Sequence, residues 1–225
     1  MSALAVKNLS KAYGGVQAVD DVSFSVAAGE LLAMIGPNGA GKTTCFNMLN
    51  GQLAADAGTL EFEGRRLNGL APREIWRMGV GRTFQITATF ASMTVRENVQ
   101  IALLSHHRRL GALFQVAARQ FRDQADALLE RVGMRAEAER ACAVLAYGNL
   151  KRVELAVALA NAPRLLLMDE PTAGMAPAER NELMRLAASL ARSSNIAVLF
   201  TEHDMDVVFT HADRIIVLAQ GRLIA

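Results

Sequence analysis

The chain has 225 residues and a formal net charge of +2 at pH 7, with 52% hydrophobic and 20% charged residues. This composition excludes an intrinsically disordered chain, a collagen-like repeat and a small disulfide scaffold. Because 24 basic residues are balanced by 22 acidic ones and only 5% of residues are aromatic, the sequence also disfavours a nucleic-acid-binding protein.

Short β-prone runs dominate the first quarter of the chain. The run Leu31 to Ile35 is apolar throughout, as expected of a strand buried on both faces. Gly36 to Gly41 ends that strand, and a helix is expected from Thr43 to Leu49. Further strands are predicted over residues 4–9, 22–26 and 59–63.

The middle of the chain has helical patterns instead. Thr94 and Glu97 match a capping box, which predicts a helix that continues to about Ser105. Apolar residues recur at helical spacing from Gln115 to Arg131, and another helix is expected from Leu150 to Asn161. We interpret this section as a helical insertion.

Strand patterns return in the last third, over residues 165–168, 197–201 and 214–218. Between the first two, Pro177 stands where a first-turn proline belongs, and a helix is expected up to about Arg192. Strands that alternate with helices predict an α/β fold with a largely parallel sheet flanked by helices.

A phosphate-binding loop is the strongest motif. The segment Gly36-Pro37-Asn38-Gly39-Ala40-Gly41-Lys42-Thr43 matches the pattern GxxxxGK[ST], with a buried strand before it and a helix, beginning with Thr43 and Thr44, after it. The glycines allow the backbone to wrap around phosphate oxygens, and the helix N-terminus adds its positive end. Lys42 is expected to reach the β- and γ-phosphates of ATP, and the Thr43 hydroxyl is expected to ligate Mg²⁺.

Two carboxylates follow the predicted strand 165–168. Asp169 is expected to hold Mg²⁺, mostly through water, and Glu170 to orient or deprotonate the attacking water. An Asp-Glu pair after a strand is by itself equally compatible with a solvated turn. Together with the phosphate loop, the pair favours a nucleotide hydrolase, because ligands bind at the carboxyl ends of strands in open α/β sheets.

In their order, these motifs resemble the nucleotide-binding subunits of ABC transporters over nearly the whole chain. The resemblance implies a P-loop NTPase core with a mainly parallel sheet, an N-terminal antiparallel β-subdomain and an inserted α-helical subdomain. It divides the single domain into a core of residues 1–85 and 163–225 and a helical part of residues 86–162. It implies that Tyr13 stacks on adenine, that Gln85 bridges Mg²⁺ and the helical part, and that His203 contacts the γ-phosphate.

The signature segment of that family corresponds here to Ala146, Tyr147, Gly148 and Asn149. The resemblance implies that this segment completes the ATP site of an opposite subunit. The usual serine is Ala146 and the usual glutamine is Asn149, so one hydroxyl donor to the γ-phosphate is lost. We therefore expect a slower or weaker site wherever this signature is used.

Several segments resemble the branched-chain amino-acid importer subfamily, a pattern that importers of urea and other amides share. They are Gly14-Gly15, Ala18 to Phe24, Arg82 to Gln85 and Met93 to Val99. The resemblance implies a motor subunit that hydrolyses ATP with Mg²⁺ and pairs with a second nucleotide-binding subunit, a heterodimer being favoured over a homodimer. It further implies membrane permease subunits and, indirectly, a solute-binding protein.

The sequence also predicts where the protein works. Its N-terminus lacks the long apolar stretch of a signal peptide, and no run of eighteen apolar residues occurs. We expect a cytoplasmic protein, peripheral on the inner face of the cell membrane, with Cys45 and Cys142 as buried thiols. The alternatives are a weakly active or degenerate ATP-binding subunit and a soluble ABC ATPase outside transport.

Overall fold

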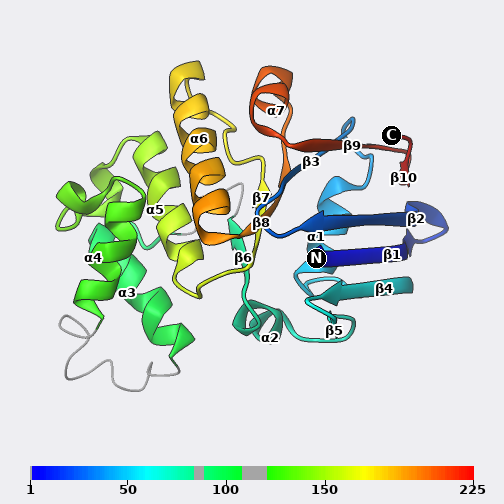
Figure 1. Ribbon diagram of the computed structural model, residues 1–225, viewed down its shortest axis with the longest axis horizontal. Coiled ribbons are helices and arrows are strands. Elements are labelled where there is room, and N and C mark those ends of the chain that lie inside the picture. The colour runs from blue at the N-terminus through cyan, green and yellow to red at the C-terminus, as the bar shows by residue number, and fades with distance from the viewer. Residues whose placement is uncertain (1, 84–88, 108–120) are drawn as a thin grey trace.

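The computed structural model describes residues 2–83, 89–107 and 121–225 (Figure 1). Two β-sheets and several helices make up these residues. The strands are β1 (Ser2–Tyr13), β2 (Val16–Ala27), β3 (Leu31–Ile35), β4 (Ala57–Phe62), β5 (Arg65–Arg66), β6 (Val80–Thr83), β7 (Leu165–Asp169), β8 (Ala197–Thr201), β9 (Arg214–Ala219) and β10 (Arg222–Leu223). The α-helices are α1 (Lys42–Leu49), α2 (Pro72–Arg77), α3 (Val95–His106), α4 (Arg122–Arg131), α5 (Tyr147–Leu159), α6 (Pro177–Ser194) and α7 (Met205–His211).

A six-stranded sheet has the order β10-β9-β3-β8-β7-β6. Its strands β9, β3, β8, β7 and β6 are parallel, and only β10 pairs antiparallel, with β9. Every residue of β7 and β8 is buried, which agrees with their continuous apolar sequences. Because the strands are parallel, their carboxyl ends lie along one edge of the sheet, and this edge positions the candidate site.

The N-terminal strands form a second, antiparallel sheet of order β2-β1-β4-β5. In β2 the buried residues alternate with exposed ones, so Val22, Phe24 and Val26 face the interior. Both β1 and β2 are longer than the predicted runs, because pairing between the two strands continues past their apolar segments to the turn at Gly14 and Gly15. The α/β class and the antiparallel N-terminal sheet are confirmed.

Each face of the six-stranded sheet packs against a different core. Leu32 and Met34 of β3 lie in a cluster with α1 and the antiparallel sheet. Their neighbours Leu31 and Ala33 point the other way, into a cluster with residues of α3, α5 and α6. Alternation along a strand therefore divides the apolar side chains of one segment between the two cores.

In the described part of the chain between β6 and β7 lie the helices α3, α4 and α5, as the helical patterns predict, and they gather at the opposite end of the molecule from the antiparallel sheet (Figure 1). The predicted capping box at the start of α3 is present, since the Thr94 hydroxyl accepts from the Glu97 amide at 3.2 Å and the Glu97 carboxylate accepts from the Thr94 amide at 2.8 Å. A buried ion pair of 2.6 Å between Arg96 and Asp126 joins α3 to α4.

Two helix starts differ from the predictions. Helix α5 begins at Tyr147 rather than at Leu150, because the extended residue Ala146 acts as its N-cap and a helical turn tolerates Gly148. Helix α4 begins at Arg122, after Phe121 in a left-handed conformation (φ 59°) that a helix cannot include. The predicted helical residues 115–120 lie outside the described residues.

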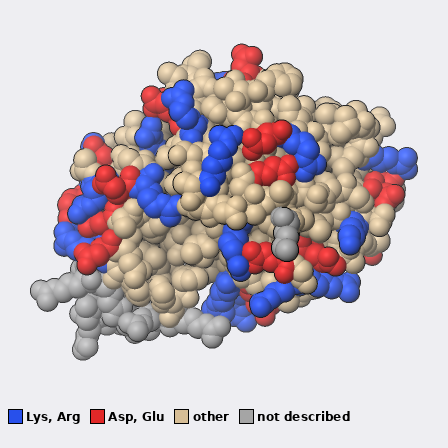
Figure 2. Space-filling view, viewed as in Figure 1, with Lys and Arg blue, Asp and Glu red and all other residues tan. Residues whose placement is uncertain are grey.

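Among the described helices, none has the length and apolar character needed to cross a bilayer. On the face shown in Figure 2, basic and acidic side chains are interspersed rather than gathered into large areas of one sign. This distribution agrees with the near balance of charges in the sequence.

Candidate functional site

The predicted site residues come from strands that end beside one another at the carboxyl edge of the six-stranded sheet. Strand β3 leads into Gly36, β7 ends at Asp169, and β8 ends at Thr201. Asp169 and Thr201 are register partners in the parallel pair of β7 and β8, and Met34 of β3 pairs with Thr201 from the other side. The register of these strands therefore brings the phosphate loop and the two carboxylates together.

The loop between β3 and α1 requires glycine at two positions. A Cβ on Gly36 would lie 2.1 Å from the Leu218 carbonyl oxygen, and one on Gly41 would lie 2.4 Å from the Ala18 carbonyl oxygen. Both glycines also have positive φ values, of 153° and 104°. By contrast, a Cβ on Gly39 would meet no atom within 4 Å, so the space above the middle of the loop is open.

Lys42 is the first residue of α1, and only 7% of its surface is exposed to solvent. Its ammonium donates to the Gly36 carbonyl oxygen at 2.6 Å and to the Pro37 carbonyl oxygen at 3.1 Å. Burial lowers the pKa of Lys42, while the charges of Glu170 and Asp169 oppose that shift. The loop and the two carboxylates thus hold a cation at the place where an anionic ligand would bind.

Both oxygens of Asp169 have partners. Oδ1 accepts from the Thr201 hydroxyl at 2.8 Å, and Oδ2 accepts from the Arg82 guanidinium at 3.2 Å. Sequence reasoning assigned no role to Thr201 or to the Arg82 side chain. The signal that could have found Thr201 is its polar character at the end of an apolar strand, directly opposite Asp169 once the register is known.

Glu170 and His203 are in hydrogen-bond contact through their side chains. The Glu170 carboxylate lies 2.9 Å from His203 Nε2, so the structure brings these two predicted residues together. Glu170 has a left-handed backbone (φ 46°), a conformation that costs energy in a non-glycine residue. Its amide donates to the Thr201 hydroxyl at 3.0 Å, which helps to hold the carboxylate beside the histidine.

A cavity of about 170 Å³ lies over the phosphate loop. Its lining consists of Ala18, Glu170 and the loop residues Asn38, Gly39, Ala40, Gly41, Lys42, Thr43 and Thr44. A buried cation, a helix N-terminus and open space above Gly39 suit the phosphate chain of a nucleotide. The cavity is smaller than a typical small-molecule pocket of about 300–1,000 Å³, so a phosphate chain fits it better than a whole nucleotide does.

The donor set also fits a magnesium ion that is bound together with phosphates. In the described part of the chain, no group of three or more His, Cys, Asp and Glu side chains could hold a metal by itself. Magnesium is usually held by one or two carboxylates plus substrate phosphates. Asp169 would supply such a carboxylate, and the exposed residue Thr43 would supply a hydroxyl ligand from the phosphate loop.

The remaining predicted residues do not line this cavity or lie outside the described residues. Tyr13 is 50% exposed at the end of the β1–β2 hairpin, with the Lys11 ammonium 5.9 Å from its ring centroid. Gln85 lies outside the described residues. The predicted signature, Ala146 to Asn149, forms the start of α5, and its residues do not line the cavity over the phosphate loop.

Comparison with known proteins places these motifs in one family. Residues 19–173 match the family model described as ABC transporter. The chain is 41% identical over 232 residues to a high-affinity branched-chain amino acid transport ATP-binding protein, LivG, of Salmonella typhimurium, covering 99% of this chain and 90% of that protein. It is 39% identical over 229 residues to BraF of Pseudomonas aeruginosa, a protein with the same description, with coverage of 99% and 90%.

Solved structures agree with this result. The ADP conformation of MJ1267, an ATP-binding cassette of an ABC transporter, matches with a TM-score of 0.89 and 32% identity, over 100% of this chain and 90% of that one. A dimeric post-hydrolysis state of the ATP-binding cassette MJ0796, bound to ADP and Pi, matches with a TM-score of 0.83 and 26% identity, over 99% and 97%. The chain therefore belongs to the ABC transporter family, and its predicted class, an ATPase, is confirmed.

Proposed function

We propose that this protein is the ATP-hydrolysing motor subunit of an importer for branched-chain amino acids or related small solutes. The observation that carries the proposal is the convergence of the phosphate loop, Asp169 and the Glu170–His203 pair at one sheet edge. The relatives described as branched-chain amino acid transport proteins support the substrate class.

In this proposal each residue around the cavity has a separate role in binding or hydrolysing ATP. Lys42 leaves the two loop carbonyls to which it donates and binds the β- and γ-phosphates, while the amides of residues 36–44 surround the phosphate chain. Glu170 orients the attacking water and accepts its proton, and His203 contacts the γ-phosphate from the same side. Tyr13, which is half exposed at the end of the β1–β2 hairpin, stacks on adenine.

The proposed magnesium ligands are Thr43, Asp169 and Gln85, with Asp169 acting mostly through water. Bound Mg²⁺ would neutralise charge on the β- and γ-phosphates. Asp169 suits this role because two donors hold its carboxylate at a fixed place beside the loop.

We also propose that residues 1–85 and 163–225 form the catalytic core and that residues 86–162 carry the signature to a partner subunit. In a head-to-tail pair of subunits, Ala146 to Asn149 would face the ATP that is held by the other subunit. Ala146 and Tyr147 are exposed at the N-terminus of α5, and none of the four residues lines this chain's own cavity, which supports that assignment.

The proposed assembly contains a second nucleotide-binding subunit, membrane permease subunits and, indirectly, a solute-binding protein. A heterodimer of nucleotide-binding subunits is favoured, because a partner with a serine in its signature would supply the donor that Ala146 lacks. The protein would then act in the cytoplasm, at the inner face of the cell membrane.

A transport assay tests this function. The chain would be co-expressed with the permease subunits of the proposed importer and reconstituted into vesicles with its solute-binding protein. We expect ATP-dependent uptake of leucine, isoleucine or valine that is lost with Glu170→Gln. Uptake of urea or short amides without branched-chain amino acids would contradict the proposed substrate class and leave the ATPase assignment intact.

One observation favours a second candidate, a subunit that binds ATP but hydrolyses it only weakly. Ala146 has no hydroxyl, and Asn149 replaces the longer glutamine side chain. If phosphate release remains negligible in the complete transporter, this second candidate replaces the first.

A further inference from the structure

Arg82 connects the candidate metal carboxylate with the rest of the catalytic core. It lies on β6, the strand next to β7, and its side chain is only 11% exposed. One guanidinium nitrogen donates to Asp169 Oδ2 at 3.2 Å. The other donates to the Asn47 side-chain oxygen on α1 and to the Gln52 side-chain oxygen, both at 2.9 Å.

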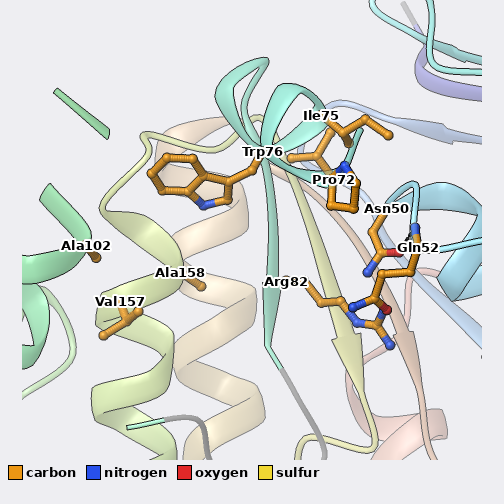
Figure 3. Close-up of a pocket in the computed structure, with 10 residues that line it drawn as sticks. Asn50, Gln52, Pro72, Ile75, Trp76, Arg82, Ala102, Val157 and Ala158 are labelled. Atoms are coloured by element: carbon orange, nitrogen blue, oxygen red, sulfur yellow. Dashed lines mark hydrogen bonds between the residues drawn. The ribbon is translucent and has the colours of Figure 1, made fainter. Parts of the chain in front are cut away.

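These contacts give Arg82 a fixed orientation. Figure 3 shows Arg82 beside Gln52 and Asn50, at one end of a pocket whose other end is lined by Trp76. Asn47 belongs to the helix that begins with Lys42, so the guanidinium joins the phosphate-loop helix to the end of β7. A planar guanidinium can serve acceptors on two sides at once, whereas an ammonium is a point charge without that geometry.

The Asp169 carboxylate is consequently held from two sides. Thr201 on β8 donates to Oδ1 and Arg82 on β6 donates to Oδ2, so neighbours on both adjacent strands fix its rotation. Residues that orient a metal ligand in this way typically change metal affinity about 10- to 100-fold when they are replaced.

We propose that Arg82 is a positioning residue, which holds the Asp169 carboxylate in the orientation needed for magnesium to bind together with nucleotide. This inference rests on the proposed role of Asp169 toward magnesium. It assigns Arg82 no contact with substrate and no part in proton transfer.

The test measures metal-dependent nucleotide binding rather than turnover. Calorimetry would give the affinity of the purified chain for a non-hydrolysable ATP analogue in excess Mg²⁺ and in EDTA. The ratio of the two affinities is the contribution of the metal. For Arg82→Met we expect that ratio to fall by about tenfold, with the affinity in EDTA little changed.

Arg96→Met is the matched control, because Arg96 is also a buried arginine paired with an aspartate, but it joins α3 to α4. It should leave the ratio unchanged even if it lowers stability. Arg82→Lys should recover only part of the loss, since lysine keeps the charge without the fork. Full recovery by lysine, or a ratio that stays equal to the parent's or rises in Arg82→Met, would overturn the inference.

Two further variants keep the test decisive. If Arg82→Met does not fold, Asn47→Ala can be used instead, because it removes one acceptor of the guanidinium and leaves Asp169 in place. It should lower the ratio of the affinities in Mg²⁺ and EDTA by less than Arg82→Met does. An unchanged ratio would count against the inference. Asp169→Asn should remove the metal contribution by itself. If it does not, the proposed role of Asp169 fails; if it does while Arg82→Met has no effect, only the role of Arg82 fails. The electron paramagnetic resonance spectrum of bound Mn²⁺ gives a second readout, which should change in Arg82→Met and not in Arg96→Met.

Discussion

At the scale of single residues, the Glu170–His203 contact gives the sharpest prediction. Glu170→Gln keeps the size and a hydrogen-bonding oxygen beside His203 but removes the base that would accept a proton from water. We expect ATP binding to persist, hydrolysis to be lost and ATP-bound dimers to accumulate. Size-exclusion chromatography with ATP and Mg²⁺, together with phosphate release, checks this, and hydrolysis at the parental rate would show that Glu170 is not the base.

Lys42 gives a second prediction at this scale. Lys42→Ala removes the buried ammonium that would bind the phosphates, so ATP affinity should fall about tenfold or more, given about 1.5–3 kcal/mol for a charge-assisted contact. Calorimetric titration with ATP measures the effect. Lys7→Ala, at an exposed position of β1, is the control and should bind ATP like the parent. Unchanged affinity in Lys42→Ala would contradict the assignment of the loop.

The two cysteines should be unreactive in the folded protein. Both are buried and free, and burial raises the pKa of Cys45 to about 12 and also raises the pKa of Cys142. At pH 8 both thiols therefore stay protonated, and only the thiolate attacks a disulfide reagent. We expect no rapid reaction with an aromatic disulfide at pH 8 and reaction of both thiols after unfolding. Rapid labelling of the native chain would show that one of them is accessible.

At the scale of an element, the start of α5 is poorly capped. Ala146 is its extended N-cap residue (φ −61°, ψ 151°) and makes no side-chain capping bond. Ala146→Ser should stabilise the protein by about 0.5–2 kcal/mol through a new cap. It should also raise hydrolysis up to roughly tenfold, if about 1.4 kcal/mol of transition-state stabilisation returns.

A second helix allows these two effects of serine to be separated. Ala71 caps α2 with nearly the same geometry (φ −71°, ψ 151°) and lies outside the signature. Ala71→Ser should therefore raise the melting temperature without raising phosphate release. If Ala146→Ser also gains only stability, the missing hydroxyl does not limit the rate.

At the scale of the whole molecule, the proposed pairing of subunits predicts a difference between the chain alone and the complex. In a homodimer both ATP sites would face Ala146, whereas a partner with a signature serine would complete the site of Lys42 here. We expect low phosphate release from the isolated chain and an increase of roughly tenfold with the partner, of the size that one recovered donor allows. A partner whose signature serine is changed to alanine is the control. Full activity of the isolated chain would contradict this prediction.

The sequence by itself determined those parts of the protein whose chemistry is local. The phosphate loop can be read directly, because its glycines and Lys42 lie within one short segment, from Gly36 to Lys42, at a fixed spacing. The alternation of strands and helices determined the α/β class in the same way, since each element carries its own apolar pattern. The roles of Gln85 and His203 came only from the family resemblance.

The tertiary structure alone decided the contacts between residues far apart in the chain. Arg82 and Asp169 are separated by 87 positions, and Asp169 and Thr201 by 32. They meet because β6, β7 and β8 are parallel neighbours in one register, which no local pattern specifies. The same holds for the left-handed backbone of Glu170, because its amide donates to the Thr201 hydroxyl, 31 positions away, at 3.0 Å.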